Sequence, residues 1–361
     1  MAKFHTLTVK DLRQETDECV SISFDVPAGL QSQFDYIQGQ YVTLRNEING
    51  EDVRRSYSIC SAPHEGELRV AVKKVPGGRF STYANEVLKK GDELSVMTPQ
   101  GRFYTELNPD YEKNYVAFAA GSGITPVISI LKSVLKLEPK SSFTLFYGNK
   151  DAQNIIFKEE IDDLKNMFMQ RLRVHHVLSR ENPGSDLFYG RIDEEKCNSF
   201  CNLLLNPEAV DEVFLCGPEP MIKAASKSME ENGVAGDKIH YELFTSPNQA
   251  SAKQHSTAKA GAQTNAAIDE SRVKVILDGE ETSFTVGTKG DNILDAALKA
   301  GTDAPFACKG AVCMTCKAKV LKGDVKMDKN YALLDEEVNQ GYVLTCQSHP
   351  TSDEVIVSFD D

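Results

Sequence analysis

Four cysteines near the C-terminal end of the chain constrain its fold more than any other feature. Three of them share one short loop, with four and then two residues between them: Cys308, Cys313 and Cys316. The fourth, Cys346, follows after 29 further residues, in the stretch Val-Leu-Thr-Cys-Gln. A tight loop can present three sulfurs on one side, so the fourth sulfur must come from a separate strand. We expect the four thiolates to bind metal together.

This spacing is the one that holds a two-iron, two-sulfur cluster, in which each iron takes two thiolates and two bridging sulfides. The alternatives are a structural zinc site and buried free cysteines. Structural zinc sites usually combine paired Cys-x-x-Cys or Cys and His sets, which a four-residue gap does not match. We therefore predict a 2Fe-2S cluster. Such a cluster carries one electron, so the rest of the chain should supply or accept electrons.

The composition narrows the class of protein further. The 361 residues are enough for two or three domains, and 41% hydrophobic residues allow ordinary cores. A net charge of −13 argues against nucleic acid and anionic membrane as partners. No apolar run approaches the roughly 18 residues of a spanning helix, and the N-terminus lacks the apolar stretch of a signal peptide. Nine cysteines without an export signal predict reduced thiols and a cytoplasmic protein.

The first part of the chain, residues 1–106, is dominated by short runs in which apolar and polar residues alternate, as in half-buried strands. The runs are separated by glycines and prolines, and a helix is expected only over residues 80–88. Short strands at regular spacing indicate a barrel or a sandwich. We predict an antiparallel β-barrel.

The pattern changes at Asn114, where continuous apolar strands begin to alternate with amphipathic helices. The first strand is Tyr115-Val-Ala-Phe-Ala-Ala. Helices are expected over residues 127–137, 158–167, 194–205 and 221–232. Strict alternation predicts an α/β doubly wound parallel sheet across residues 107–245.

A composition break separates this region from the cysteine-containing end. Residues 246–271 contain no Phe, Tyr, Leu or Val, and we expect them to form a flexible linker. Residues 272–361 should form an α+β domain, a mixed sheet crossed by one main helix over residues 293–300. A shorter helix is expected over 333–338. This arrangement suits a β-grasp fold.

Two motifs in the first region carry possible chemistry. Arg55 and Tyr57 share one face of a strand, because they are two residues apart. An Arg can bind a pyrophosphate with two hydrogen bonds and a Tyr ring can stack on a flat heterocycle, while Ser58 can bond its reactive nitrogen. Gly78 and Ser81 precede a helix, where backbone N–H groups bind phosphate. Taken alone, the first stretch is more typical of plain barrel surface and the second of a hairpin turn followed by a Ser N-cap.

Two further motifs stand at the ends of apolar strands, where doubly wound sheets bind nucleotides. Gly121-Ser-Gly-Ile-Thr-Pro follows the first strand, with Pro126 expected at the first helical position. The stretch Cys216-Gly-Pro-Glu-Pro-Met ends the fourth strand, so Cys216 could lie beside a nicotinamide ring. The plain alternative for Cys216 is a small core residue.

In this order, the motifs resemble those of the ferredoxin–NADP reductase superfamily, and in particular of oxygenase reductases with a C-terminal plant-type ferredoxin domain. The likeness covers nearly the whole chain except residues 246–271. It rests on Arg-Ser-Tyr-Ser-Ile-Cys, Gly-Gly-Arg-Phe-Ser, Ala-Ala-Gly-Ser-Gly-Ile-Thr-Pro, Tyr-Gly-Asn, Cys-Gly-Pro-Glu-Pro-Met, Ala-Cys-Lys-Gly and Gly-Tyr-Val-Leu-Thr-Cys-Gln.

The resemblance implies an NAD(P)H-dependent oxidoreductase that binds FAD, a 2Fe-2S cluster and NADPH, with NADH possible, and that passes electrons to the oxygenase component of a multicomponent complex. It divides the chain into an FAD-binding domain (1–106), an NAD(P)-binding domain (107–245), the linker and a ferredoxin domain. The implied FAD contacts are Arg55, Tyr57, Ser58, Gly78, Ser81 and Phe244. The implied nucleotide contacts are Gly121, Gly123, Thr125, Pro126, Gly217 and Pro218. Ser58, Cys216 and Glu242 would surround the reacting rings, and Cys308, Cys313, Cys316 and Cys346 would hold the cluster.

Ser179 and Arg180 resemble the Ser-Arg pair with which NADPH-using relatives bind the 2′-phosphate, and Lys150 could add charge there. Asp151 and Glu181 lie nearby, which keeps NADH possible. The family loop usually has Gly in place of Ala311 and a small residue in place of Met314. A left-handed backbone at Ala311 costs about 1 kcal/mol, and Gly310 could absorb some strain.

Three functions remain open from the sequence: the reductase of one particular diiron oxygenase, the reductase of another ring-hydroxylating or phenol-type oxygenase, and an electron carrier or zinc-stabilised module without reductase activity. The acceptor, the oligomeric state and the reduction potentials are not encoded in these motifs.

Overall fold

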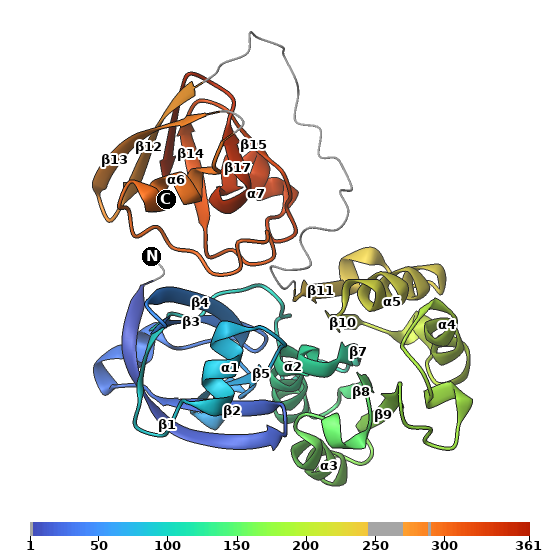
Figure 1. The fold of residues 1–361 in the computed structure, drawn as a ribbon. Coiled ribbons are helices and arrows are strands. Elements are labelled where there is room, and N and C mark those ends of the chain that lie inside the picture. Colours follow the sequence, from blue (N-terminus) through green and yellow to red (C-terminus); the bar gives the residue numbers. More distant parts are fainter. Residues whose placement is uncertain (1–2, 245–269, 288–289) are drawn as a thin grey trace. The chain divides into compact units, whose positions relative to one another are not determined.

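The computed structural model describes residues 3–244, 270–287 and 290–361. The chain forms two compact units, one of residues Phe4–Phe244 and one that contains Thr245–Asp361 (Figure 1). Nearly all of the expected linker, residues 246–271, lies outside the described residues. Strand β12 begins at Glu270, two residues before the expected start of the last domain.

The first half of the larger unit is a curled antiparallel sheet, or half-barrel, in the order β4-β3-β6-β1-β2-β5. One bridge between Ile59 and Val70 joins its two edges. The elements are β1 (Phe4–Thr16), β2 (Cys19–Asp25), β3 (Tyr41–Ile48), β4 (Glu51–Ser58), β5 (Leu68–Lys73), α1 (Arg79–Glu86) and β6 (Glu93–Met97). The expected antiparallel class is therefore confirmed.

The second half is a five-stranded parallel sheet in the order β11-β10-β7-β8-β9. Its strands are β7 (Asn114–Ala120), β8 (Ser142–Asn149), β9 (Leu172–Leu178), β10 (Glu212–Gly217) and β11 (Ile239–Leu243). Its helices are α2 (Ile124–Leu137), α3 (Lys158–Met167), α4 (Glu194–Leu203) and α5 (Glu219–Glu231). The predicted doubly wound sheet is confirmed.

The continuous apolar strands arise because helices cover both faces of this sheet (Figure 1). Tyr115 and Ala117 pack with α2 and α3, whereas Val116 and Phe118 pack with α4 and α5. The first of these cores also includes Cys60 and other residues of the antiparallel half. The two halves of the larger unit are thus joined by a shared apolar core.

The smaller unit contains a mixed sheet in the order β13-β12-β18-β14-β16, in which β12 and β18 run parallel. Its elements are β12 (Glu270–Leu277), β13 (Glu280–Gly287), α6 (Ile293–Lys299), β14 (Lys317–Lys322), β15 (Val325–Met327), α7 (Asp335–Asn339), β16 (Tyr342–Leu344), β17 (Ser348–Pro350) and β18 (Glu354–Ser358). The buried side of α6 packs on this sheet through Ile293 and Leu294. The short strands β15 and β17 form a separate pair.

Two expected boundaries are wrong in ways that affect the candidate site. Helix α2 begins at Ile124, so Pro126 is its third residue and not its first. A proline is tolerated there because the N–H groups of the first turn have no partner within the helix. The alternating run over residues 68–75 predicts a strand, but strand β5 ends at Lys73, because the Val75 N–H bonds the Ser81 hydroxyl at 3.2 Å.

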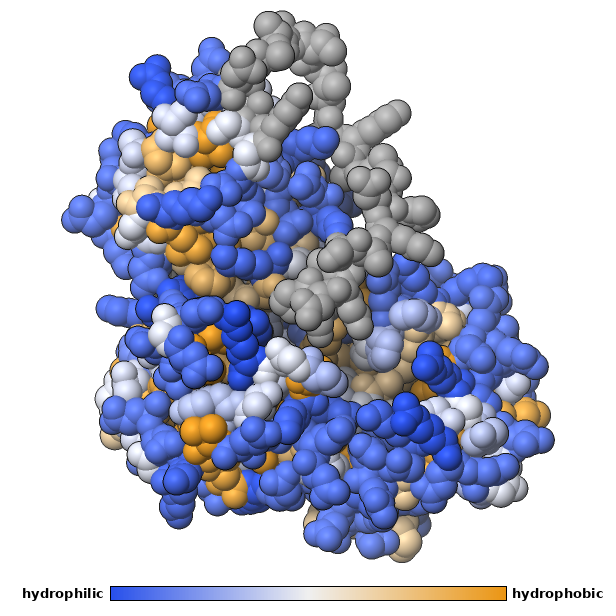
Figure 2. Space-filling view, viewed as in Figure 1, coloured by the Kyte–Doolittle hydropathy of each residue, from blue (hydrophilic) through white to orange (hydrophobic). Residues whose placement is uncertain are grey.

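The face drawn in Figure 2 is mostly hydrophilic, with small apolar areas between polar ones. Among the described residues, no helix has both the length and the apolar character needed to cross a membrane.

Candidate functional site

Strand β4 carries Arg55, Tyr57 and Ser58, and its successive side chains point to opposite faces of the sheet. Arg54 is buried and forms an ion pair with Asp52 at 2.8 Å. Arg55 and Tyr57 point the other way and are partly buried. The Tyr57 ring lies 5.6 Å from that of Phe80 in α1, and burial raises the pKa of Tyr57 above its usual range. Tyr57 therefore stays a neutral, largely apolar ring, as stacking on a flat heterocycle requires.

The turn that leads into α1 lies beside this ring. Gly78 immediately precedes the helix, and a β-carbon at Gly78 would collide with the Ser81 hydroxyl. That hydroxyl donates to the Gly78 carbonyl at 3.3 Å and accepts from the Val75 N–H at 3.2 Å. Gly78 and Ser81 thus shape a tight turn at a helix start, which is the arrangement expected of a phosphate-binding loop.

The end of β4 meets the end of β11. Ser58 is buried, and its hydroxyl donates to the Glu242 carboxylate at 3.1 Å. Burial raises the pKa of Glu242 to about 7, and the bond from Ser58 opposes part of that rise. A carboxyl group that titrates near neutral pH can hold or release a proton at this position.

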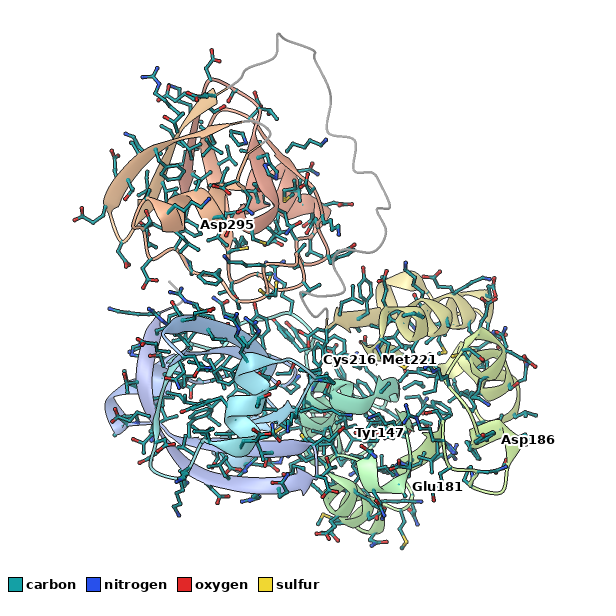
Figure 3. All side chains as sticks on the ribbon, viewed as in Figure 1. Tyr147, Glu181, Asp186, Cys216, Met221 and Asp295 are labelled. Carbon is teal, nitrogen blue, oxygen red and sulfur yellow. The ribbon has the colours of Figure 1, made fainter. Side chains whose placement is uncertain are left out.

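Cys216 lies on β10 opposite Glu242 on β11, in the same register of the parallel pair. Its side chain is fully buried, and burial, together with the Glu242 charge, raises the pKa of its thiol. Cys216 is therefore a neutral thiol beside the Ser58–Glu242 pair. Figure 3 labels it at this end of the parallel sheet, together with Met221 in α5. Phe244, directly after β11, is 40% exposed.

The expected nucleotide loop lies at the same edge of the parallel sheet. Gly121 has a left-handed backbone (φ 54°), and the Thr125 hydroxyl donates to the Ser122 carbonyl at 3.0 Å. A β-carbon at Gly123 would collide with the Cys216 carbonyl oxygen, so the loop packs directly against Cys216 and Gly217. The loop before α2 and the one before α5, where Pro218 caps the helix, are thereby held side by side.

One residue at this loop was missed by sequence reasoning. Lys73, the last residue of β5, belongs to the antiparallel half, yet its ammonium would lie 3.7 Å from a β-carbon at Gly121. It brings a positive charge to a loop at the start of a helix, where backbone N–H groups favour phosphate. Nothing in the local pattern around Lys73 signals this position, because the contact spans two halves of the unit.

The residues expected at a 2′-phosphate lie at the ends of β8 and β9. The Ser179 hydroxyl donates to the Asn149 carbonyl at 3.2 Å, and the Arg180 side chain is exposed. Lys150, in contrast, pairs with Glu18 at 3.6 Å. The nearby acids are also engaged, since Glu181 accepts from the Ala152 N–H and Asp151 accepts from the Asn154 N–H.

The four cysteines of the smaller unit come together as two pairs. Cys308 and Cys313 have sulfurs 3.1 Å apart, and Cys316 and Cys346 form the second side-chain hydrogen bond. The bond from Cys313 lowers the pKa of Cys308, as do backbone N–H groups of the loop. Within the described parts of the chain, no group of three or more His, Cys, Asp or Glu side chains is arranged to hold one metal ion. Two thiol pairs fit the ligand demand of two irons.

Ala311, which stands where the family loop usually has Gly, has the left-handed backbone that the resemblance implied. Ala311 is fully buried with φ 64°, and its neighbour but one, Lys309, also has a positive φ of 49°. Gly310 is not among the residues with positive φ, so it does not take the left-handed position for Ala311. The loop therefore holds a strained alanine where a glycine is free of strain.

A curled antiparallel sheet, a parallel nucleotide-binding sheet and a loop of paired thiols together define a flavin- and iron–sulfur-dependent reductase. The family models agree: an oxidoreductase FAD-binding domain matches residues 6–104, an oxidoreductase NAD-binding domain residues 118–227, and a 2Fe-2S iron-sulfur cluster binding domain residues 275–351. The chain belongs to the family of oxygenase reductase components that combine these three domains.

The relatives span the whole chain. One component of the 1,2-phenylacetyl-CoA epoxidase of Escherichia coli K12 is 42% identical over 100% of this chain and 99% of its own length. The ferredoxin reductase component of 3-ketosteroid-9-alpha-monooxygenase from Mycobacterium tuberculosis is 32% identical over 98% of this chain and 96% of its own. The structure of phthalate dioxygenase reductase matches with a TM-score of 0.58 over 99% of this chain and 98% of its own, at 21% identity. The resemblance and the fold class predicted from the sequence are thus confirmed.

Proposed function

We propose that this chain is the NADPH-dependent reductase of a diiron oxygenase, and specifically of a phenylacetyl-CoA 1,2-epoxidase in the degradation of phenylacetate. The oxygenase assignment rests on one observation, the 42% identity over the whole chain to a component of such an enzyme. We also infer that it acts in the cytoplasm, on the grounds of its composition. The domain limits given above, 1–106, 107–245 and 272–361, are part of this proposal.

The flavin, when bound, would accept a hydride from the nicotinamide and release electrons one at a time to the cluster. The residues proposed to hold it are Arg55 at the pyrophosphate, Tyr57 on the ring, and Gly78 and Ser81 at the phosphate-binding turn. Ser58 and Glu242 would hold a proton near the reacting ring. Their mutual distance of 3.1 Å and the Glu242 pKa of about 7 support that role.

The nucleotide would bind along the edge of the parallel sheet. We propose that Gly121, Gly123, Thr125, Pro126, Gly217 and Pro218 surround its pyrophosphate and nicotinamide, with Lys73 supplying charge. Cys216 would place a neutral thiol next to the nicotinamide. Ser179 and Arg180 are proposed to bind the 2′-phosphate, which NADPH carries and NADH lacks. The Arg180 side chain, two residues after β9, is exposed and therefore open to such a contact.

The direct test is reconstitution. The purified chain should show flavin and iron–sulfur absorption, and with a phenylacetyl-CoA oxygenase component it should couple NADPH oxidation to epoxide formation. If NADPH oxidation is coupled only to a ring-hydroxylating or phenol-type oxygenase, the chain is the reductase of that oxygenase instead. A protein that shows cluster absorption but no flavin, or no colour at all, would favour a carrier or a zinc-stabilised module.

A further inference from the structure

A buried lysine connects the two halves of the larger unit. Lys132 lies in the middle of α2, and its side chain is only 7% exposed. Its ammonium bonds Glu65 at 2.9 Å and Glu160 at 2.8 Å. Glu65 ends a short 3-10 helix (Pro63–Glu65) of the antiparallel half, whereas Glu160 lies in α3 of the parallel half. Removing an ammonium from water costs free energy, which nearby carboxylates must offset. Lys132 is therefore stable in this interface only because Glu65 and Glu160 pair with it.

A second bond from the same helix reaches the same segment. Ser129, three residues before Lys132 and therefore on the same helical face, donates from its hydroxyl to the Ser61 carbonyl at 2.6 Å. The Glu65 oxygen that binds Lys132 also accepts from the Ala62 N–H at 2.6 Å. Helix α2 thus holds the segment 59–65 at two points.

This segment and this helix each lead directly to the candidate site. Segment 59–65 continues β4, whose last residue is Ser58, the hydrogen-bond donor to Glu242. Helix α2 begins at the loop Gly121–Gly123, which is the proposed nucleotide loop. One rigid helix therefore carries the nucleotide loop at its start and binds the extension of the flavin strand two turns later.

We propose that Lys132 is a positioning residue, whose ion pair with Glu65 fixes Ser58 and the flavin strand relative to the nucleotide loop. This inference rests on the proposed hydride transfer between the two rings. Such a transfer is sensitive to geometry, since a displacement of about 1 Å can lower a rate by about 100-fold. Breaking the pair should therefore slow hydride transfer, while nucleotide affinity, whose proposed contacts other than Lys73 all lie in the parallel half, is largely retained.

The two carboxylates provide a matched comparison. Glu65→Gln removes the negative charge of the ion pair that crosses between the halves, whereas Glu160→Gln removes the charge of a pair of similar length with the same ammonium within one half. Both glutamates are partly exposed, 32% and 40%, so neither change leaves a bare charge in the core. The variants are made in the full, FAD-loaded chain. Flavin reduction is followed by stopped-flow absorbance, nucleotide affinity by the dependence of that rate on NADPH concentration, and backbone exposure by hydrogen–deuterium exchange.

With Glu65→Gln, we expect flavin reduction at saturating NADPH to slow on the order of 10-fold, the nucleotide Kd to stay within about 2-fold, and exchange in segment 59–65 to rise. With Glu160→Gln, the rate and the exchange in 59–65 should stay near wild type. Lys132→Gln should reproduce the Glu65→Gln defect, and the double variant should be no slower than Lys132→Gln, because the two residues act through one pair.

Equal effects of the two glutamate variants, or unchanged exchange in segment 59–65 with Glu65→Gln, would overturn the proposal. If Lys132→Gln fails to fold, the two glutamate variants still decide it. Wild-type flavin that NADPH does not reduce would refute the proposed function instead. The exchange comparison between Glu65→Gln and Glu160→Gln needs no nucleotide, so it still tests the ion pair in that case.

Discussion

The Ser58 hydroxyl donates a 3.1 Å hydrogen bond to the carboxylate of Glu242, which lies 184 positions further along the chain. This bond joins the last residue of β4 to the edge strand β11 of the parallel sheet. Cys216 is the register partner of Glu242 on β10. Three side chains that are far apart in the sequence thus meet where the two sheets adjoin.

Replacing Glu242 by Gln should remove a pH dependence centred near neutrality. The folded-state pKa of about 7 lies above the ordinary value of 4.5, so the folded protein retains the proton between these values. This contribution to stability is complete below pH 4.5 and is lost as the pH rises through 7. In wild type, the flavin-reduction rate at saturating NADPH should therefore change with an inflection near pH 7. Glu242→Gln should flatten that profile.

The thermal unfolding temperature, Tm, reports the protonation of Glu242 independently of the reaction rate. Between pH 5 and 8 the Tm of wild type should fall relative to that of Glu242→Gln, because the unfolded wild-type chain releases the Glu242 proton at a lower pH than the folded protein does. An identical inflection in the rate profile of the variant would assign the titration to another residue.

Cys346→Ser should abolish the cluster and leave the flavin half working. Serine removes a soft thiolate from the pair with Cys316, and iron–sulfur clusters prefer thiolate ligands. We expect loss of iron and of cluster absorption, loss of electron delivery to the oxygenase, and retained NADPH reduction of an artificial acceptor at FAD. Cys201→Ser, which changes a buried thiol of the larger unit, is the control and should keep its iron. A normal cluster spectrum in Cys346→Ser would exclude Cys346 as a ligand.

Arg180→Ala should lower the preference for NADPH. A charge-assisted bond to the 2′-phosphate accounts for about 10- to 100-fold in discrimination, and NADH carries no such phosphate. The kcat/KM for NADPH should fall by that factor while the kcat/KM for NADH barely changes. An equal fall for both nucleotides, or for neither, would show that Arg180 does not bind the 2′-phosphate.

Lys73→Met should weaken the binding of both nucleotides alike, because the pyrophosphate that we place near Gly121 is common to NADPH and NADH. We expect a rise in KM of about 10-fold for each, the size of one charge-assisted bond. Lys74→Met is the matched control, since the neighbouring ammonium pairs with Glu86 at the surface. A selective loss of NADPH with Lys73→Met would place the lysine at the 2′-phosphate instead.

Much of the fold was predictable because the spacing of apolar residues differs between residues 1–106, where they alternate with polar ones, and the part after Asn114, where they form continuous runs. The strand Tyr115–Ala120 is buried on both faces, and its unbroken apolar sequence predicted the parallel sheet. The bounds of strand β1 are harder to predict, since bulges between Val9 and Asp11 and between Gln14 and Thr16 interrupt its alternation. The three-residue strands β15 and β17 are too short for any period to be visible.

The candidate site was predictable only where a motif is local. Gly121 and Cys216 each end an apolar strand, and the edge of a parallel sheet brings such ends together. Lys73 and Lys132 could not be found in this way, because the contact of Lys73 with the Gly121 loop and the pair of Lys132 with Glu65 both cross between the two halves of the unit. The left-handed Ala311 was anticipated only because a resemblance supplied the glycine to compare it with.

The contact between Gly123 and the Cys216 carbonyl has a consequence for protein engineering. Two loops from distant parts of the chain fill each other's space, so a side chain introduced at position 123 would displace the loop after β10 as well. A library that randomises Gly121–Pro126 should therefore yield functional variants only with Gly123 unchanged. Variation aimed at a new nucleotide preference belongs at Arg180, which follows β9 and has an exposed side chain, so we expect its exchange to require no backbone movement.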